Sequence, residues 1–175
     1  MLEALQSSLA PYYSIIKFVH VFFVMIWAWS TAVAYTWYVK GAFLRWEKNP
    51  EDPTVVQRRN WAIEQFDKGV VMEHVAFPII LVTGPMLYFL GGWNLDFTWL
   101  AVKLSIVVLI FVPLEIFDYW LSHFGGNKLK LKRQQEWDKY ERAIQQHWKF
   151  LKASTPIIML TVPTVIYLAI VKPMT

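Results

Sequence analysis

A histidine stands inside a long apolar run of the chain, where an ionisable side chain is costly. His20 lies within residues 18–39, which contain no Asp, Glu, Lys or Arg and are long enough to cross a bilayer. Ionisable groups at that depth usually face the interior of a helix bundle and mark a ligand, ion or proton site. Lys17 precedes His20 by one turn and Trp27 follows it by seven residues, so a helix places all three on one face. We therefore expect a functional site around His20.

Lys103 is a second charged group inside an apolar run, at a depth similar to that of His20. One interpretation is snorkelling, in which the apolar stem crosses hydrocarbon and the ammonium reaches the headgroups. The other is that Lys103 binds an anionic ligand, or serves as an axial ligand, together with His20 and Lys17. Lys17 lies nearer the end of its run, where an interfacial position competes with ligand binding.

The other three histidines are expected together at the far ends of three apolar runs. Neutral imidazole ligates haem iron, copper or zinc, so His20, His74 and His147 are candidate metal ligands. His74 and His147 could form a second site, separate from His20, and His123 could belong to it as well. The competing interpretation is that interfacial histidines are simply solvated. Glu115 and Asp118, one turn apart, could pair with basic residues, orient a histidine or pass protons.

The elements that must position these residues are membrane-spanning helices. The chain has 175 residues, of which 56% are hydrophobic, and the apolar residues are concentrated in long runs. Four runs qualify as spans: residues 13–39, 70–93, 97–121 and 153–171. The sequence predicts a single-domain, all-α integral membrane four-helix bundle in contact with a lipid bilayer.

The loops predict the orientation of the spans. Both long loops, between the first and second spans and between the third and fourth, are rich in Lys and Arg, whereas residues 91–96 contain neither. The positive-inside rule places the long loops in the cytoplasm and both termini outside. We expect short cytoplasmic helices in them: one capped by Thr54 and running toward Asp67, and one from about Leu129 to Lys149 that continues into the last span.

Composition excludes several kinds of chemistry. The chain has no cysteine, which rules out disulfides, iron–sulfur clusters and thiolate catalysis. It contains no motif for phosphate binding, a Ser–His–Asp set or nucleic-acid recognition. Ten tryptophans exceed what interfacial belts need, and Trp27 could form the wall of a planar cofactor pocket or simply pack.

Several short motifs resemble one family of membrane proteins. They are Tyr12-Tyr13, Lys17-Phe-Val-His20, Trp27-Ala28, Pro78 with Thr83-Gly84, Trp99-Leu-Ala-Val-Lys103-Leu104, Pro156 and Val171-Lys172-Pro173. This set is similar to the HemJ-type proteins, bacterial four-helix proteins linked to protoporphyrinogen IX oxidation and reported to carry haem b. The resemblance implies haem or porphyrin contact for His20 and Lys103, and a place in the bacterial inner membrane.

The chain also departs from that family. Ala34-Tyr35-Thr36-Trp37 replaces a Leu-Pro-Arg stretch, and Ala153-Ser154-Thr155-Pro156 replaces Asn-Glu-x-Pro. The leading hypothesis is a haem b-binding redox protein, with protoporphyrinogen oxidation as one activity of a divergent member. The alternative is a non-catalytic b-type cytochrome or accessory subunit, in a homo-oligomer or larger membrane complex. A copper-handling protein is a weaker third hypothesis, because no Met or His cluster supports it.

Overall fold

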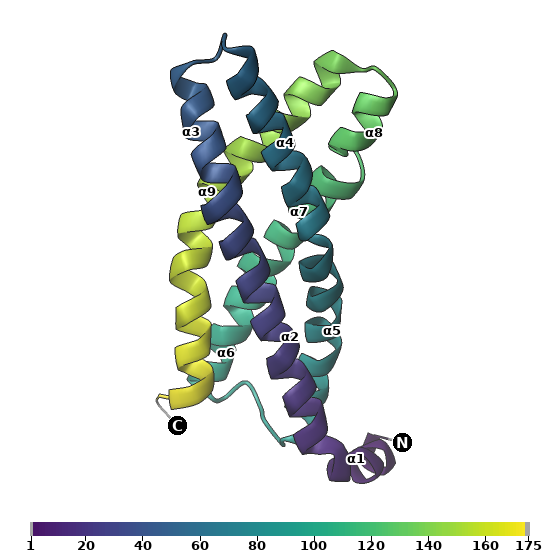
Figure 1. The fold of residues 1–175 in the computed structure, drawn as a ribbon. Helices are drawn as coiled ribbons and strands as arrows, with labels where there is room; N and C mark the ends of the chain where they lie inside the picture. Colours follow the sequence, from purple (N-terminus) through teal and green to yellow (C-terminus); the bar gives the residue numbers. More distant parts are fainter. Residues whose placement is uncertain (1, 174–175) are drawn as a thin grey trace.

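Four helical rods run along the whole molecule (Figure 1). The computed structural model describes the backbone of residues 2–173 and the side chains of residues 6–30 and 32–173. The first rod comprises α2 (Tyr13–Ala34), a π-helical turn η2 (Tyr35–Val39) and α3 (Lys40–Lys48), and the second comprises α4 (Pro53–Gly69) and α5 (Val71–Leu90). The third comprises α6 (Thr98–Ile106), a π-helical turn η3 (Val107–Phe111) and α7 (Val112–His123), and the fourth is α9 (Trp137–Val171). The short elements are α1 (Leu2–Leu9), the 3-10 turn η1 (Ala10–Tyr12) and α8 (Lys128–Arg133).

The four rods confirm the predicted all-α membrane bundle. Four helices are long and apolar enough to cross a bilayer, and the described residues contain no strand. Their outward faces carry large apolar side chains such as Leu109, Met159 and Ile170, which are 72%, 72% and 75% exposed. A bilayer covers such a surface, so the protein is a multi-pass membrane protein.

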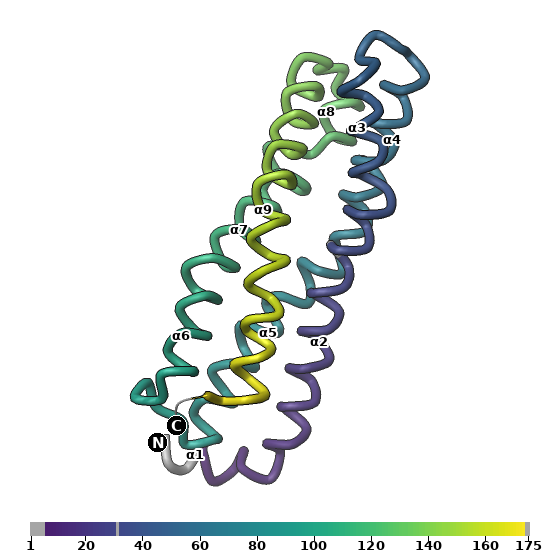
Figure 2. Tube along the Cα trace, turned by 90° about the vertical axis from the view of Figure 1, so that its left-hand side faces the viewer, coloured from purple at the N-terminus to yellow at the C-terminus, as the bar shows by residue number. Residues whose placement is uncertain are grey.

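The two ends of the bundle differ in character. One end is formed by α3, α4, α8 and the start of α9, and we call it the charged end (Figure 1). The opposite end holds α1, the connection between α5 and α6, and the end of α9 (Figure 1). In Figure 2, α2 lies beside α5 and α6 beside α9, as the packing of these pairs also shows.

Two local predictions at the charged end are wrong. Asp52, rather than Thr54, caps α4, because its Oδ1 accepts hydrogen bonds from the backbone N–H groups of Thr54 (2.8 Å) and Val55 (3.4 Å). The helix expected from Leu129 to Lys149 is broken, since α8 ends at Arg133 and Gln135 has a positive φ of 59°. The continuation of the second part into the last span is confirmed by α9.

The core forms three apolar layers along the bundle. The layer at the charged end includes Val39, Phe43, Ile63, Phe66 and Ile144. The middle layer is centred on Trp27, Ala76, Phe77 and Phe111, and the layer at the opposite end on Trp99, Leu100 and Leu168. Polar side chains lie between these layers.

A proline shapes the helix that carries two of the buried acids. Pro113 has no N–H to donate to the carbonyl one turn earlier, and the wide turn η3 immediately precedes it. The turn rotates α7 relative to α6, so that Glu115 and Asp118 are both buried inside the bundle.

Candidate functional site

His20 is held by a hydrogen bond between two membrane helices. Its Nδ1 lies 2.8 Å from Oγ1 of Thr83 on α5. The Thr83 hydroxyl donates its own proton to the carbonyl of Ile79, at 2.7 Å, so it accepts from His20. The ring proton is therefore on Nδ1, and Nε2 carries a lone pair with no hydrogen-bond partner among the described residues. The ring packs beside Gly84, where a Cβ would lie in ordinary van der Waals contact, 3.5 Å from its Cε1.

Unpaired donors lie on α6 at the same end of the bundle, next to the residue that follows α9. The Lys103 ammonium has no hydrogen bond or ion pair with any described residue, and it is close enough to His20 for their charges to interact. The Trp99 indole, one turn earlier on α6, is buried and its Nε1 has no partner among the described side chains. The Nζ atom of Lys172 lies 4.4 Å from the centroid of the Trp93 ring and 5.7 Å from the centroid of the Trp99 ring. The region is rich in donors and poor in acceptors.

The structure separates the other two predicted contacts from His20. Lys17 is exposed on α2, as an interfacial lysine would be. Trp27 is buried two turns deeper, where its ring packs on Phe77 and Phe111. Its Nε1 donates a 2.6 Å hydrogen bond to Oε1 of Glu115. The structure thus brings Lys103 toward His20, whereas Trp27 belongs to a second polar region.

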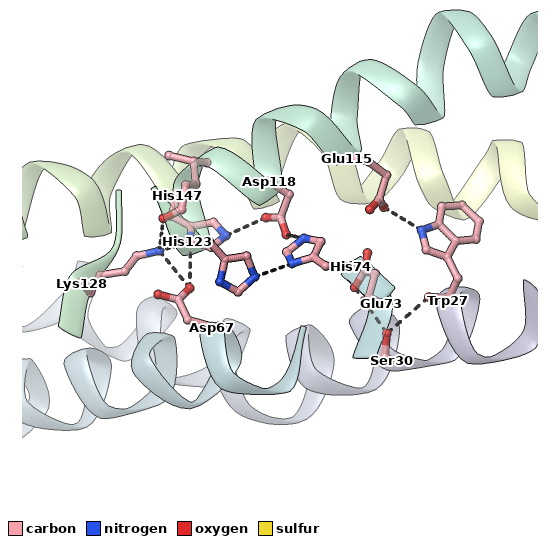
Figure 3. Close-up of polar contacts among 11 residues, drawn as sticks. Trp27, Ser30, Asp67, Glu73, His74, Glu115, Asp118, His123, Lys128 and His147 are labelled. Atoms are coloured by element: carbon pink, nitrogen blue, oxygen red, sulfur yellow. Dashed lines mark hydrogen bonds and ion pairs between the residues drawn. The ribbon is translucent and has the colours of Figure 1, made fainter. Parts of the chain in front are cut away.

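The remaining three histidines meet around one carboxylate (Figure 3). Oδ2 of Asp118 lies 3.1 Å from Nε2 of His74, and its Oδ1 lies 2.9 Å from Nε2 of His147. A carboxylate only accepts hydrogen bonds, so both rings carry a proton on Nε2. Nδ1 of His74 then accepts from Nε2 of His123, at 2.8 Å. When the rings are neutral, this one acid fixes all three tautomers.

Lys128 and Asp67 extend this cluster toward α4. Lys128 is fully buried, and its Nζ donates to Oδ1 of Asp67 (2.9 Å), to the Leu121 carbonyl (3.2 Å) and to Nδ1 of His147. The chain can turn this tightly because residue 126 is glycine: a Cβ there would lie only 2.5 Å from the Leu121 carbonyl oxygen. Asn127 then caps α8 by accepting from the Lys130 N–H at 2.9 Å.

Two further carboxyl groups lie between this cluster and Trp27. Glu73 precedes His74 on α5, and Glu115 precedes Asp118 by one turn on α7. Both are buried, and they are close enough for their charges to interact. The Ser30 hydroxyl lies 3.4 Å from Oε2 of Glu73. Neither acid has a Lys or Arg partner among the described residues.

The candidate metal ligands at the charged end have no free ring nitrogen. Both nitrogens of His74 and both of His147 take part in the hydrogen bonds described above. A metal ion would have to displace one of these bonds. Within the described part of the chain, no group of three or more His, Asp or Glu side chains is arranged to hold a metal ion.

Sequence reasoning overlooked Thr83, Trp99, Asp67 and Lys128. The sequence places Asp67 only at the end of a cytoplasmic helix and Lys128 only in a basic loop, although the two residues are 7% and 0% exposed. The Gly125-Gly126 pair directly before Asn127 was the one available signal, because it marks a sharp reversal that can direct the next side chains inward.

The fold and its buried polar groups define a class: an all-α, multi-pass membrane protein with two separate polar regions inside the bundle. No family model, no curated protein and no solved structure matches this chain.

Proposed function

We propose that the protein is a haem b-binding membrane protein of redox function, with His20 as an axial ligand. The observation that carries the proposal is the state of the His20 ring. Histidines that bind metals donate their other ring N–H to a neighbouring acceptor, which fixes the ring and its tautomer. Thr83 accepts from Nδ1 of His20, and the Nε2 lone pair remains free for iron.

The donors around His20 fit the other groups of a haem. Haem carries two carboxylates, which need cations or N–H donors when they lie at the edge of an apolar site. Lys103 is an unpaired ammonium and Trp99 has a buried, unpartnered indole N–H. The half-buried apolar side chains of Phe23 and Ile26 follow His20 within two turns on α2, and Ile80 precedes Thr83 by one turn on α5; they pack against the middle layer and suit a porphyrin face.

Each residue then has a defined task. His20 ligates, Thr83 orients the imidazole, and Lys103 binds a carboxylate. A bound haem supplies one-electron transfer, while the protein supplies ligation and burial. The resemblance to HemJ-type proteins makes oxidation of protoporphyrinogen IX the reaction to test. We further propose that the charged end faces the cytoplasm of a bacterial inner membrane, by the positive-inside rule.

The test is an absorption spectrum of the full-length protein purified from a haem-replete host. We expect a Soret band that is absent in His20→Ala. Phe18→Ala is the matched control, because Phe18 is 68% exposed on the same helix, and this variant should retain the band. A wild-type sample without a Soret band, or a His20→Ala sample with full haem content, would contradict the proposal.

A second candidate is a non-catalytic b-type cytochrome that belongs to a larger membrane complex. It is favoured by large exposed aromatic side chains on the first rod, where Trp29 and Trp37 are 70% and 79% exposed. Such residues are enriched where proteins meet in a complex. Co-purification of a second membrane protein, lost in a Trp29→Ala/Trp37→Ala variant, together with no turnover of protoporphyrinogen IX, would support this candidate over the oxidase.

A further inference from the structure

An unbroken series of hydrogen bonds joins six ionisable side chains at the charged end (Figure 3). In order along the series they are His123, His74, Asp118, His147, Lys128 and Asp67. His123 is partly exposed, and the other five are buried. We propose that His123, His74 and Asp118 relay protons from the surface at the charged end to the Glu73–Glu115 pair inside the membrane.

Each proton transfer in this relay is chemically balanced. Nδ1 of His123 has no partner among the described residues and accepts a proton from the aqueous surface. His123 then releases its Nε2 proton to Nδ1 of His74, and His74 releases its own Nε2 proton to Oδ2 of Asp118. Only N–H and O–H bonds form and break, no electrons move, and one proton taken from solvent becomes one proton on a buried carboxylate.

The Glu73–Glu115 pair is a suitable acceptor. Both carboxyl groups are buried and have only the neutral donors Trp27 and Ser30 beside them, so a proton that arrives there removes a buried charge that no described Lys or Arg offsets. Glu73 adjoins His74 in the chain, and Asp118 and His74 are close enough to act electrostatically on Glu115. No direct hydrogen bond is found between Asp118 and either acid in the described structure, so the last transfer, from Asp118 to the pair, requires a bridging water.

Every helix that surrounds the relay contributes to its charge balance. The titratable groups facing it are Asp67 from α4, Glu73 from α5, Glu115 and Tyr119 from α7, Lys128 from α8 and His147 from α9. Asp67 pairs with Lys128, and His147 connects that pair to Asp118. The hydrogen-bonded group of His147, Lys128 and Asp67 keeps Asp118 in its anionic form while His74 and His123 exchange protons. A purely structural network would contain the same contacts but would not carry protons.

The experiment measures hydrogen–deuterium exchange of the buried carboxylic acid in the full-length protein in lipid vesicles. Infrared absorption of the protonated C=O group is followed after mixing with deuterated buffer. Glu115→Gln and Glu73→Gln assign the band. His74→Gln keeps a polar side chain but cannot titrate, and we expect it to slow exchange by about tenfold or more, as loss of a positioned proton carrier does. Ser122→Ala is the control, because Ser122 is buried on α7 and its hydroxyl has no partner among the described residues.

A surface variant distinguishes a relay from a structural role. His123→Ala should also slow exchange, and imidazole added to the buffer should restore the rate, because a free imidazole can replace a surface proton carrier but not a packing contact. Exchange at the wild-type rate in both His74→Gln and His123→Ala, or a carboxylic acid band that survives both Glu→Gln changes, would overturn the proposal. The measurement needs no haem, so its outcome is independent of the function proposed above.

Discussion

His20 and Thr83 are joined by a 2.8 Å hydrogen bond that ties α2 to α5 inside the membrane. The Thr83 hydroxyl is itself fixed, because it donates to the Ile79 carbonyl of its own helix. Threonine hydroxyls in membrane helices commonly donate a hydrogen bond to a backbone carbonyl one turn earlier in the same helix. Here the same oxygen also accepts a hydrogen bond from an imidazole. The bond fixes the His20 ring before any ligand arrives, which reduces the cost of ordering it on binding.

Thr83→Val should weaken haem binding without abolishing it. The valine keeps the shape of the side chain but cannot accept from His20, and loss of such a supporting contact typically lowers metal affinity by about tenfold to a hundredfold. Haem titration of the apoprotein gives the affinity. Thr161→Val is the matched control, because the Thr161 hydroxyl makes the same bond to its own helix, at 2.7 Å from the Ile157 carbonyl, and contacts no histidine. Equal losses in the two variants would contradict a role for Thr83 in positioning His20.

Lys103→Met should remove the preference of the site for porphyrin carboxylates. Methionine retains the apolar stem and loses the charge, and a hydrogen bond to a charged group contributes about 1.5–3 kcal/mol, or roughly tenfold or more in affinity. The measurement compares the Kd values of haem and of its dimethyl ester. Wild type should favour the free acid, whereas Lys103→Met should bind both forms with similar affinity. An unchanged preference would show that Lys103 only snorkels.

The apolar pattern was sufficient to predict the bundle and to single out His20 and Lys103. Burial of a charge in hydrocarbon is costly wherever the helix lies, so His20 and Lys103 stand out in the sequence alone. The helix cap at Asp52 and the break at Gln135 were not predictable at that level. They depend on competition between neighbouring polar residues for the same backbone groups, and the sequence offers both Asp52 and Thr54 as caps.

The cluster at the charged end could be predicted only as a set of candidates. Its members come from α4, α5, α7, α8 and α9, and Asp67 lies 61 residues from Lys128 in the chain. Their pairing depends on how the helices rotate about their own axes, which periodicity does not give. Lys128 shows this clearly. A lysine that follows a Gly-Gly-Asn turn in a basic loop is ordinarily solvated, yet here it is fully buried.

Arg59→Lys should destabilise the charged end although the charge is kept. The Arg59 guanidinium is 1% exposed, donates to both carboxylate oxygens of Glu141 at 2.8 and 2.5 Å, and lies 4.5 Å from the centroid of Trp46. Lysine cannot form this bidentate hydrogen bond to a carboxylate, so we expect a loss of about 1–3 kcal/mol in the free energy of unfolding. Reversible unfolding in mixed detergent micelles measures it. Arg58→Lys makes the same change at the exposed neighbouring position and should have little effect.

Asp118→Asn should change the tautomer of His74 or His147. The amide presents one accepting oxygen and one donating nitrogen, whereas both rings now direct Nε2–H at residue 118. One ring must move its proton to Nδ1 or lose its hydrogen bond, at a cost of about 1–3 kcal/mol. Nitrogen-15 chemical shifts of the histidine rings report the tautomers. Asp138→Asn, at an exposed position on α9, is the control, and unaltered shifts in Asp118→Asn would contradict the assigned hydrogen bonds.

The orientation of the bundle can be tested because the chain has no cysteine of its own. Glu51→Cys places a thiol in the α3–α4 turn at the charged end, and Asn94→Cys places one in the connection between α5 and α6. Both positions are exposed, so accessibility depends only on the side of the membrane. In intact bacterial spheroplasts, a membrane-impermeant maleimide should label the thiol at position 94 and leave that at position 51 unlabelled until the membrane is disrupted. The reverse pattern would place the charged end outside, and the proposed relay would then draw its protons from the outer side of the membrane.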